Sequence, residues 1–251
     1  MTASLPMYDW PEVRAETDAY WAALGDGLRN LGLDAPVDLA RPIDDVWAHW
    51  RDPALAISQT CGLPYSARLA GEVSLLGAPA YAIPKTRPGF YRSEIVVRAD
   101  DPAQSVDDLK GRRFAYNMRE SQSGYACFLA DHGDPATWFD LVETGAHRAS
   151  AQAVAAGDVD LACIDAASWL LFERHDPAAA KLRVLARTSP TPGLPYITAE
   201  TDELTLARMR LMIETTIVTL PKAITGALFL TGFAKLRPSD YAPLAAGWPD
   251  A

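Results

Sequence analysis

The sequence predicts an α/β protein with two lobes, each built on a mainly parallel sheet flanked by helices. Short apolar runs with strand composition alternate with longer stretches whose apolar residues recur at helical spacing, the pattern of strands joined by helices. The alternation forms two series, one ending near Arg98 and the next beginning near Asp100. Two extended segments, near 91–100 and 188–198, separate the series, and we expect them to act as the two crossover strands of a hinge.

A long helix follows the first expected strand of the first series. Pro11 stands near its start, apolar residues recur at helical spacing as far as Leu31, and Gly32 is a suitable C-cap. The continuous apolar run 54–58 has the composition of a buried parallel strand. The other elements expected in this series are strands at 3–8, 35–39, 72–76 and 90–98 and helices at 44–50 and 63–69.

The second series alternates in the same way. A helix begins at His147 and is closed by Gly157, and a buried strand follows at 159–164. The other elements expected here are strands at 113–116, 142–145 and 182–188, helices at 125–130, 166–174 and 201–220, and a short helix from about Pro221.

The two crossovers imply that the first lobe is discontinuous in sequence. We expect residues 1–92 and 189–251 to form lobe one, and residues 93–188 to form lobe two. Ligands of open α/β sheets bind beyond the carboxyl ends of the strands. The expected ligand position is therefore the cleft between the lobes.

Composition excludes several classes of function. The formal net charge is −9 and no basic run is present, which argues against a nucleic-acid partner, because such binding depends on neutralising phosphates. No apolar run reaches the ~20 residues of a membrane helix, and the N-terminus lacks a secretory signal pattern. We therefore expect a cytoplasmic location as the sequence stands, or a periplasmic one if a leader was removed. Cys61, Cys127 and Cys163 lack the spacing of a zinc site or a disulfide framework, and we expect buried, reduced thiols.

The segment 117–125, Asn-Met-Arg-Glu-Ser-Gln-Ser-Gly-Tyr, is the most informative stretch of the chain. It joins an expected strand to an expected helix, and the first amides of a helix have no partners within it and attract an anion. Ser121 and Ser123 add hydroxyl donors, and Gly124 permits the close approach of a ligand. The segment therefore predicts an oxyanion cradle; the alternative is a capped helix whose serines bond only to their own backbone.

Catalytic motifs do not accompany this turn. Serine, histidine and aspartate all occur near the expected cleft, but the chain has no G-x-S-x-G elbow, no Walker P-loop, no Rossmann glycine fingerprint and no H-E-x-x-H sequence. We therefore expect a binding protein rather than an enzyme, with no cofactor and no metal.

Several blocks at specific spacing give the chain a family resemblance. It resembles the phosphate/phosphonate-type solute-binding proteins of ABC transporters, which have the type II periplasmic-binding-protein fold, over nearly its whole length. The segments 7–9 and 58–62 look like a leaderless branch of this group. The blocks that carry the resemblance are 108–115, 121–125, 145–150 with 153–160, and Ile164-Asp165.

The resemblance implies roles for the serine turn. Ser121 and Ser123, with amides of the same turn, are expected to hold the oxygens of a phosphonate or phosphate, and His147 is expected to be a further oxyanion donor from the second lobe. The family often has threonine between the two serines, where this chain has Gln122. That glutamine still offers a side-chain donor and a backbone amide.

The resemblance also assigns residues away from the turn. Asp165 is expected to face the non-phosphonate end of the ligand, where it can meet a ligand amine, and Tyr8 and Tyr91 are expected to wall the cleft. From the residues alone, His147 and Asp165 are also suited to be helix N-caps. For Asp165 the two roles are compatible, because a capping carboxylate at the cleft can still face a ligand.

Four further polar residues lie at expected strand ends or crossovers. Ser58, Gln59 and Thr60 follow the apolar strand and are either ligand contacts or an ordinary polar turn. Arg92, at the first crossover, either meets an anion or pairs with a surface carboxylate.

The sequence thus predicts a solute-binding component of ABC-type uptake that holds a small oxyanion between two lobes and has an ABC permease as its partner. The alternative is a cytoplasmic ligand sensor that uses the same cleft, favoured by the missing leader. An enzyme acting on a phosphate ester or a pyrimidine is a third, disfavoured interpretation, because no catalytic motif supports it.

Overall fold

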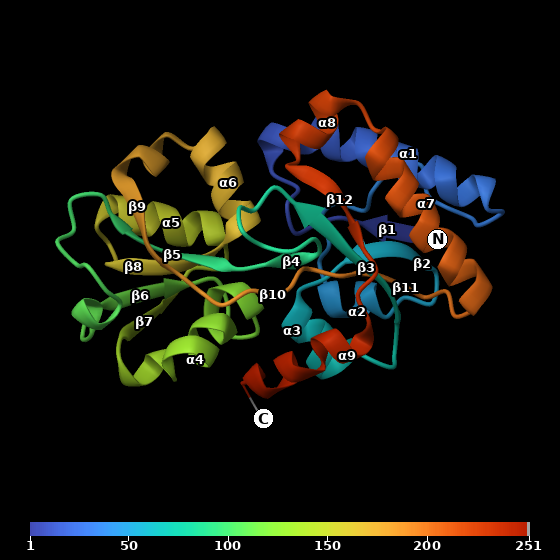
Figure 1. Cartoon of the computed structure of the whole chain (residues 1–251). Coiled ribbons are helices and arrows are strands. Elements are labelled where there is room, and N and C mark those ends of the chain that lie inside the picture. Colours follow the sequence, from blue (N-terminus) through green and yellow to red (C-terminus); the bar gives the residue numbers. More distant parts are fainter. Residues whose placement is uncertain (250–251) are drawn as a thin grey trace. The chain divides into compact units, whose positions relative to one another are not determined.

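The computed structural model describes residues 1–249 and divides into two compact units (Figure 1). Unit 1 contains residues 1–90 and 192–243, and unit 2 contains residues 91–191 and 244–249. Each unit has a five-stranded sheet with helices packed against it. The predicted α/β class is therefore confirmed.

The sheet of unit 1 has the strand order β1-β2-β11-β3-β12. Only β1 and β2 run parallel, and β11 is antiparallel to both of its neighbours. β12 is antiparallel to β3 at the edge. The strands are β1 (Thr2–Ser4), β2 (Leu55–Gln59), β3 (Ser74–Tyr81), β11 (Tyr196–Thr198) and β12 (Leu230–Ala234).

Two long helices, α1 (Arg14–Asn30) and α7 (Glu203–Thr219), pack against each other in unit 1 (Figure 1). Trp21 and Leu24 of α1 and Ile213 of α7 belong to one buried cluster with residues of the sheet. Burying each such side chain contributes about 1.5–3 kcal/mol, so this cluster is a main source of the stability of the unit. The helical period seen in the sequence is the period of this buried face.

The sheet of unit 2 has the order β7-β6-β8-β5-β9. β6 runs parallel to β7 and β8, whereas β5 is antiparallel to β8 and β9. Its strands are β5 (Ser93–Arg98), β6 (Arg113–Tyr116), β7 (Asp140–Glu143), β8 (Leu161–Asp165) and β9 (Leu182–Arg187), and its main helices are η4 (Gln122–Ala126), α4 (Cys127–His132), α5 (His147–Ala156) and α6 (Ala166–His175).

An aromatic cluster joins strand β6 to helix α4. The ring centroids of Phe114 and Phe128 are 5.2 Å apart, and those of Phe114 and Phe139 are 5.5 Å apart. All three side chains are buried in the core of unit 2. This packing holds the end of β6 against the start of α4, and the serine turn lies between these two elements in the chain.

The remaining elements are short. A turn of 3-10 helix precedes α1, and β4 pairs with β10 as a separate two-stranded sheet. The short elements are η1 (Pro11–Val13), α2 (Val46–Trp50), α3 (Gly62–Pro64), η2 (Tyr65–Leu69), β4 (Phe90–Tyr91), η3 (Asp107–Leu109), η5 (Pro135–Thr137), η6 (Pro177–Lys181), β10 (Thr191–Pro192), α8 (Lys222–Ala227), α9 (Pro238–Tyr241) and η7 (Ala242–Gly247). Within residues 1–249, no helix combines the length and the apolarity needed to cross a bilayer.

Some expectations about the strands were wrong in detail. Both sheets are mixed rather than mainly parallel, because alternating elements reveal the fold class but not the direction of each strand. The segment 35–39 forms no strand. Its apolar residues Ala35 and Leu39 are buried in the core of unit 1, so their pattern reports burial rather than strand pairing. The expected strand at 90–98 is divided into β4 and β5.

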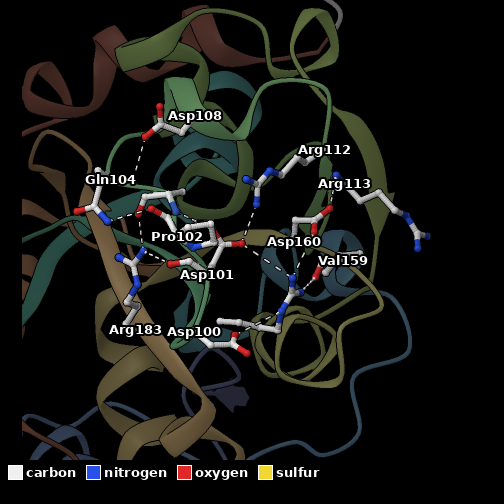
Figure 2. A network of polar contacts seen from close by, with 12 residues as sticks. Asp100, Asp101, Pro102, Gln104, Asp108, Arg112, Arg113, Val159, Asp160 and Arg183 are labelled. Atoms are coloured by element: carbon white, nitrogen blue, oxygen red, sulfur yellow. Dashed lines mark hydrogen bonds and ion pairs between the residues drawn. The ribbon is translucent and has the colours of Figure 1, made fainter.

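A polar network fixes the segment that follows β5 (Figure 2). The side chain of Asp101 is only 2% exposed, and one of its carboxylate oxygens lies 2.7 Å from the guanidinium of Arg112. Arg183 of β9 donates to the backbone carbonyl of Asp101 at 2.9 Å. Figure 2 shows these side chains converging on Asp101 from separate parts of unit 2. The network therefore holds together the chain around β5, β6 and β9.

Candidate functional site

The serine turn begins with a helix cap. Ser121 has an extended backbone, and its hydroxyl oxygen accepts a hydrogen bond from the Gly124 amide at 3.0 Å. The first turn is wide: the Ala126 amide donates to the Ser121 carbonyl five residues earlier, at 3.0 Å. Such π turns are uncommon and often mark functional sites. The helix then continues as α4, and Ser121 has the capping role that the alternative interpretation of the turn supposed.

Gly124 is where the turn comes closest to the end of β6. A Cβ atom at this position would lie 1.9 Å from the Oδ1 atom of Asn117 and 3.3 Å from its backbone nitrogen. Only glycine fits this close approach. Gly124 was predicted to permit the close approach of a ligand. In the structure, the atom nearest to an added Cβ at this position belongs to Asn117.

Ser123 contacts a histidine from another element. Its Oγ atom lies 2.8 Å from the Nε2 atom of His147, the first residue of α5. Helix α5 is anchored at the same end, because the hydroxyls of Thr144 and Ser150 are 2.6 Å apart and the Ser150 amide donates to the Ala146 carbonyl. The structure therefore brings together Ser121, Gln122, Ser123, Gly124 and His147, all within unit 2.

Burial lowers the pKa of His147 to about 4. Removing the imidazole from water disfavours its charged form, and at neutral pH the ring is uncharged. It can therefore either donate or accept one hydrogen bond at Nε2, as its contact with the Ser123 hydroxyl requires.

The lowered pKa of His147 predicts a specific dependence of stability on pH. An exposed histidine has a pKa of about 6.5, so the neutral ring should contribute stability that is fully present above about pH 6.5 and lost as the pH falls through about 4. We expect His147→Gln to remove this part of the acid dependence in urea unfolding curves, with His132→Gln as the matched control. An NMR titration that places the pKa of His147 near its ordinary value would contradict the prediction.

A second layer of polar groups lies beneath the turn. The Ser93 hydroxyl donates to the Ser123 carbonyl at 2.9 Å, and the Cys127 thiol contacts the same carbonyl at 2.9 Å. The sulfur atoms of Cys127 and Cys163 are 3.6 Å apart, and both thiols are free and buried, as expected. Cys61 is partly exposed, so the expectation of burial was wrong for that residue, which stands directly before the short helix α3.

Asp165 ends strand β8 and caps helix α6. Its Oδ1 atom accepts a hydrogen bond from the Ser168 amide at 2.9 Å, and the residue is 1% exposed. In the antiparallel pairing of β5 and β8, Asp165 lies opposite Ser93. The capping role anticipated from the sequence is present, on the strand neighbouring the one that supports Ser123.

Arg92 belongs to a buried ion cluster. Its Nε atom lies 3.2 Å from one carboxylate oxygen of Glu94, and the Nε atom of Arg187 lies 2.9 Å from the other. The carboxylate partner of Arg92 is therefore buried, not at the surface as the alternative interpretation supposed. Glu94, Asn117 and Ser93 were not predicted as site residues. A charged residue inside the apolar strand 93–98 is a signal that could have identified Glu94.

Of the other predicted residues, Tyr8, Ser58, Gln59 and Thr60 lie in unit 1, and Tyr91 is the first residue of unit 2. Tyr8 packs edge-on against Tyr81 with ring centroids 4.9 Å apart, and the Gln59 amide donates to the Tyr81 hydroxyl at 3.3 Å. Ser58 is bonded to the Ser4 hydroxyl at 2.7 Å, and the Thr60 amide donates to the Pro195 carbonyl. Tyr91, in β4, is buried. The ligand roles of these residues remain predictions.

The serine and histidine do not form a catalytic triad. A triad needs a carboxylate that orients the histidine, and in the described part of the chain no carboxylate is hydrogen-bonded to His147. The arrangement instead offers two hydroxyls, an imidazole and the first amides of a helical segment. These groups are suited to hold a small anion by hydrogen bonds.

The comparison of the sequence with protein families gives one broad match. Residues 16–241 match the family described as ABC transporter, phosphonate, periplasmic substrate-binding protein. The match spans most of both units, including the serine turn and His147. No curated protein matches the chain.

Solved structures resemble the chain over nearly its whole length. A binding-protein component of an ABC phosphonate transporter from Pseudomonas aeruginosa has a TM-score of 0.74 at 17% identity, covering 98% of this chain and 84% of that protein. PhnD1 from Prochlorococcus marinus, solved with methylphosphonate, has a TM-score of 0.73 at 16% identity and covers 98% and 96%. A Xanthomonas citri protein bound to chloride ion has a TM-score of 0.70 at 18% identity and covers 100% and 97%. These likenesses confirm the predicted type II fold.

Proposed function

Because the chain belongs to the periplasmic substrate-binding protein family of phosphonate ABC transporters, we propose that its serine turn binds the oxyanion head of a small phosphonate or phosphate. The family resemblance seen in the sequence blocks is confirmed. The family supplies transporters with their substrate-binding component and works with ABC permeases; it is not enzymatic. The identity of the ligand and the roles of individual residues are our proposals.

The observation that carries the proposal is the 2.8 Å contact between Ser123 Oγ and His147 Nε2. It brings a hydroxyl and an imidazole from two separate elements to one point at the start of a helical segment. An oxyanion placed there accepts hydrogen bonds from the Ser123 hydroxyl, from a protonated Nε2 and from the free amides at the start of the turn. The neutral ring needs no counter-ion before the ligand arrives.

The shape of the turn supports the same function. The contact between Gly124 and Asn117 and the cap formed by Ser121 fix the backbone before any ligand binds. The bonds from Ser93 and Cys127 hold the Ser123 carbonyl from below. Donors that are already in place lose little conformational freedom on binding, which favours affinity.

Isothermal titration calorimetry tests the proposal directly. The wild-type protein should bind methylphosphonate, 2-aminoethylphosphonate or inorganic phosphate, with glycerol as an uncharged control that should give no signal. An absence of heat with all three anions, confirmed by equilibrium dialysis, would count decisively against oxyanion binding.

Asp165 is proposed to select ligands that carry an amine. Asp165→Asn keeps an oxygen that can cap α6 but removes the negative charge. We expect this substitution to weaken the binding of 2-aminoethylphosphonate by about 10- to 100-fold, the range for a hydrogen bond to a charged group. The affinity for phosphate should be nearly unchanged. Asp107→Asn, at an exposed position, is the matched control. Equal losses for both ligands in calorimetry would reject a role for Asp165 in amine recognition.

A further inference from the structure

The middle residue of the serine turn has an unusual environment. Gln122 is 2% exposed, and its Oε1 atom is buried and has no hydrogen-bond partner in the described part of the chain. The Oδ1 atom of Asn117, which lies against Gly124 in the same turn, is also buried without a partner. One unsatisfied acceptor thus belongs to the serine turn, and a second lies against it.

Neighbouring hydroxyls are already engaged with other groups. Ser121 accepts from the Gly124 amide and lies 3.4 Å from the Ser123 hydroxyl, and Ser123 contacts His147. Buried polar atoms in native proteins almost always have a partner, so an orphaned oxygen at a binding turn points to a donor that arrives with the ligand.

The missing donor limits the chemical class of the ligand. A fully ionised tetrahedral oxyanion such as sulfate has only acceptor oxygens, and placing it beside an amide oxygen leaves both groups unsatisfied. A singly protonated phosphonate or phosphate carries one P–OH group, which can donate to that oxygen while its other oxygens accept from the turn.

This inference rests on the proposed function. We propose that Gln122 is a specificity-determining residue whose amide oxygen accepts a hydrogen bond from the protonated oxygen of the ligand, so that the turn selects hydrogen phosphonates and hydrogen phosphate over sulfate. A site built to bond a hydroxyl rejects an analogue that lacks it, because its own polar group is then left buried and unpaired.

The test measures affinities for methylphosphonate, inorganic phosphate and sodium sulfate by calorimetry, at one mildly acidic pH where methylphosphonate is mostly singly protonated. A single pH keeps the ionisation of the protein groups constant. Wild type should prefer methylphosphonate over sulfate by about 10-fold or more, as expected for one hydrogen bond to a charged partner. Gln122→Met, which has a similar shape without polar atoms, should reduce this ratio towards one, and Gln104→Met is the matched control.

A second variant identifies the atom responsible. Gln122→Glu keeps an acceptor and removes the amide donor, so it should retain the preference for methylphosphonate and bind sulfate still more weakly. It also serves if Gln122→Met fails to fold, as judged by circular dichroism. Sulfate bound as tightly as methylphosphonate by wild type, an unchanged ratio in Gln122→Met, or loss of methylphosphonate binding in Gln122→Glu would each overturn the inference.

The outcomes also separate this inference from the function on which it rests. A wild-type protein that binds methylphosphonate and sulfate equally refutes selection by Gln122 and leaves oxyanion binding intact. A wild-type protein that binds none of the three anions refutes the proposed function, and the inference falls with it.

Discussion

Replacing Ser123 by alanine is expected to weaken methylphosphonate binding by about 10- to 100-fold, the value of one hydrogen bond to a charged group. The substitution removes the hydroxyl that would donate to the ligand. It also removes the 2.8 Å partner of the His147 Nε2 atom, so the ring loses a contact that helps to orient it. Both losses act on the oxyanion, so affinity should fall for every anion that binds, whatever its organic part.

The measurement is calorimetry on Ser123→Ala and on Ser189→Ala, an exposed serine of the same unit that serves as control. Thermal unfolding should show that both variants are folded, because the carbonyl of residue 123 still accepts from Ser93 in either case. If Ser123→Ala bound methylphosphonate within about twofold of wild type, well below the loss expected for one hydrogen bond to a charged group, the turn would not be the oxyanion site.

Adding a single methyl group at Gly124 is expected to destabilise the protein by about 1–3 kcal/mol, the usual cost of overpacking. The new Cβ atom would lie 1.9 Å from Asn117 Oδ1, so the asparagine side chain must move from its place against the turn. The nearby backbone nitrogen of Asn117, 3.3 Å away, limits how far the turn itself can shift. Oxyanion affinity should fall together with stability, because the displaced turn carries Ser123.

A double-mutant cycle isolates this clash. Asn117→Ala should recover most of the stability lost in Gly124→Ala, since it removes the atom that the methyl group would meet. Gly226→Ala is the matched control, because an added Cβ at that helical glycine meets no atom within 4 Å. Urea unfolding of the four proteins gives the coupling, and additive effects at positions 117 and 124 would show that the two residues do not interact as described.

These expected effects follow from a turn whose conformation is held by contacts within unit 2. The aromatic contact between Phe114 and Phe128 holds strand β6 against helix α4, and the turn between them can adopt few conformations. Helix α5 brings His147 to the same point. Under the proposed function, donors that are already positioned would favour affinity, because little conformational freedom is lost on binding.

Sequence patterns were most reliable where a local rule applied. The helix 147–156 was predicted with the bounds that the structure shows, because Gly157 adopts the left-handed conformation of a C-cap. Ser121 caps a helix, as the alternative interpretation of the serine turn supposed, because capping depends on a few adjacent residues. By contrast, the apolar pattern at 35–39 predicted a strand that does not form, since apolar residues can be buried without pairing.

The amino-acid sequence alone determined the alternation of strands and helices, the serine turn and the family. Each of these depends on residues near one another in the chain, such as helical period, capping and the spacing of blocks. Only the tertiary structure decided that Ser123 contacts His147, that Ser93 donates a hydrogen bond to the turn and that Glu94 forms an ion pair with Arg92. Two of these contacts, Ser93–Ser123 and Ser123–His147, join residues far apart in sequence. Arg92 and Glu94 are close in sequence, but their pairing could not be predicted without knowing that both are buried. Such contacts are set by sheet order and packing, which no local pattern encodes.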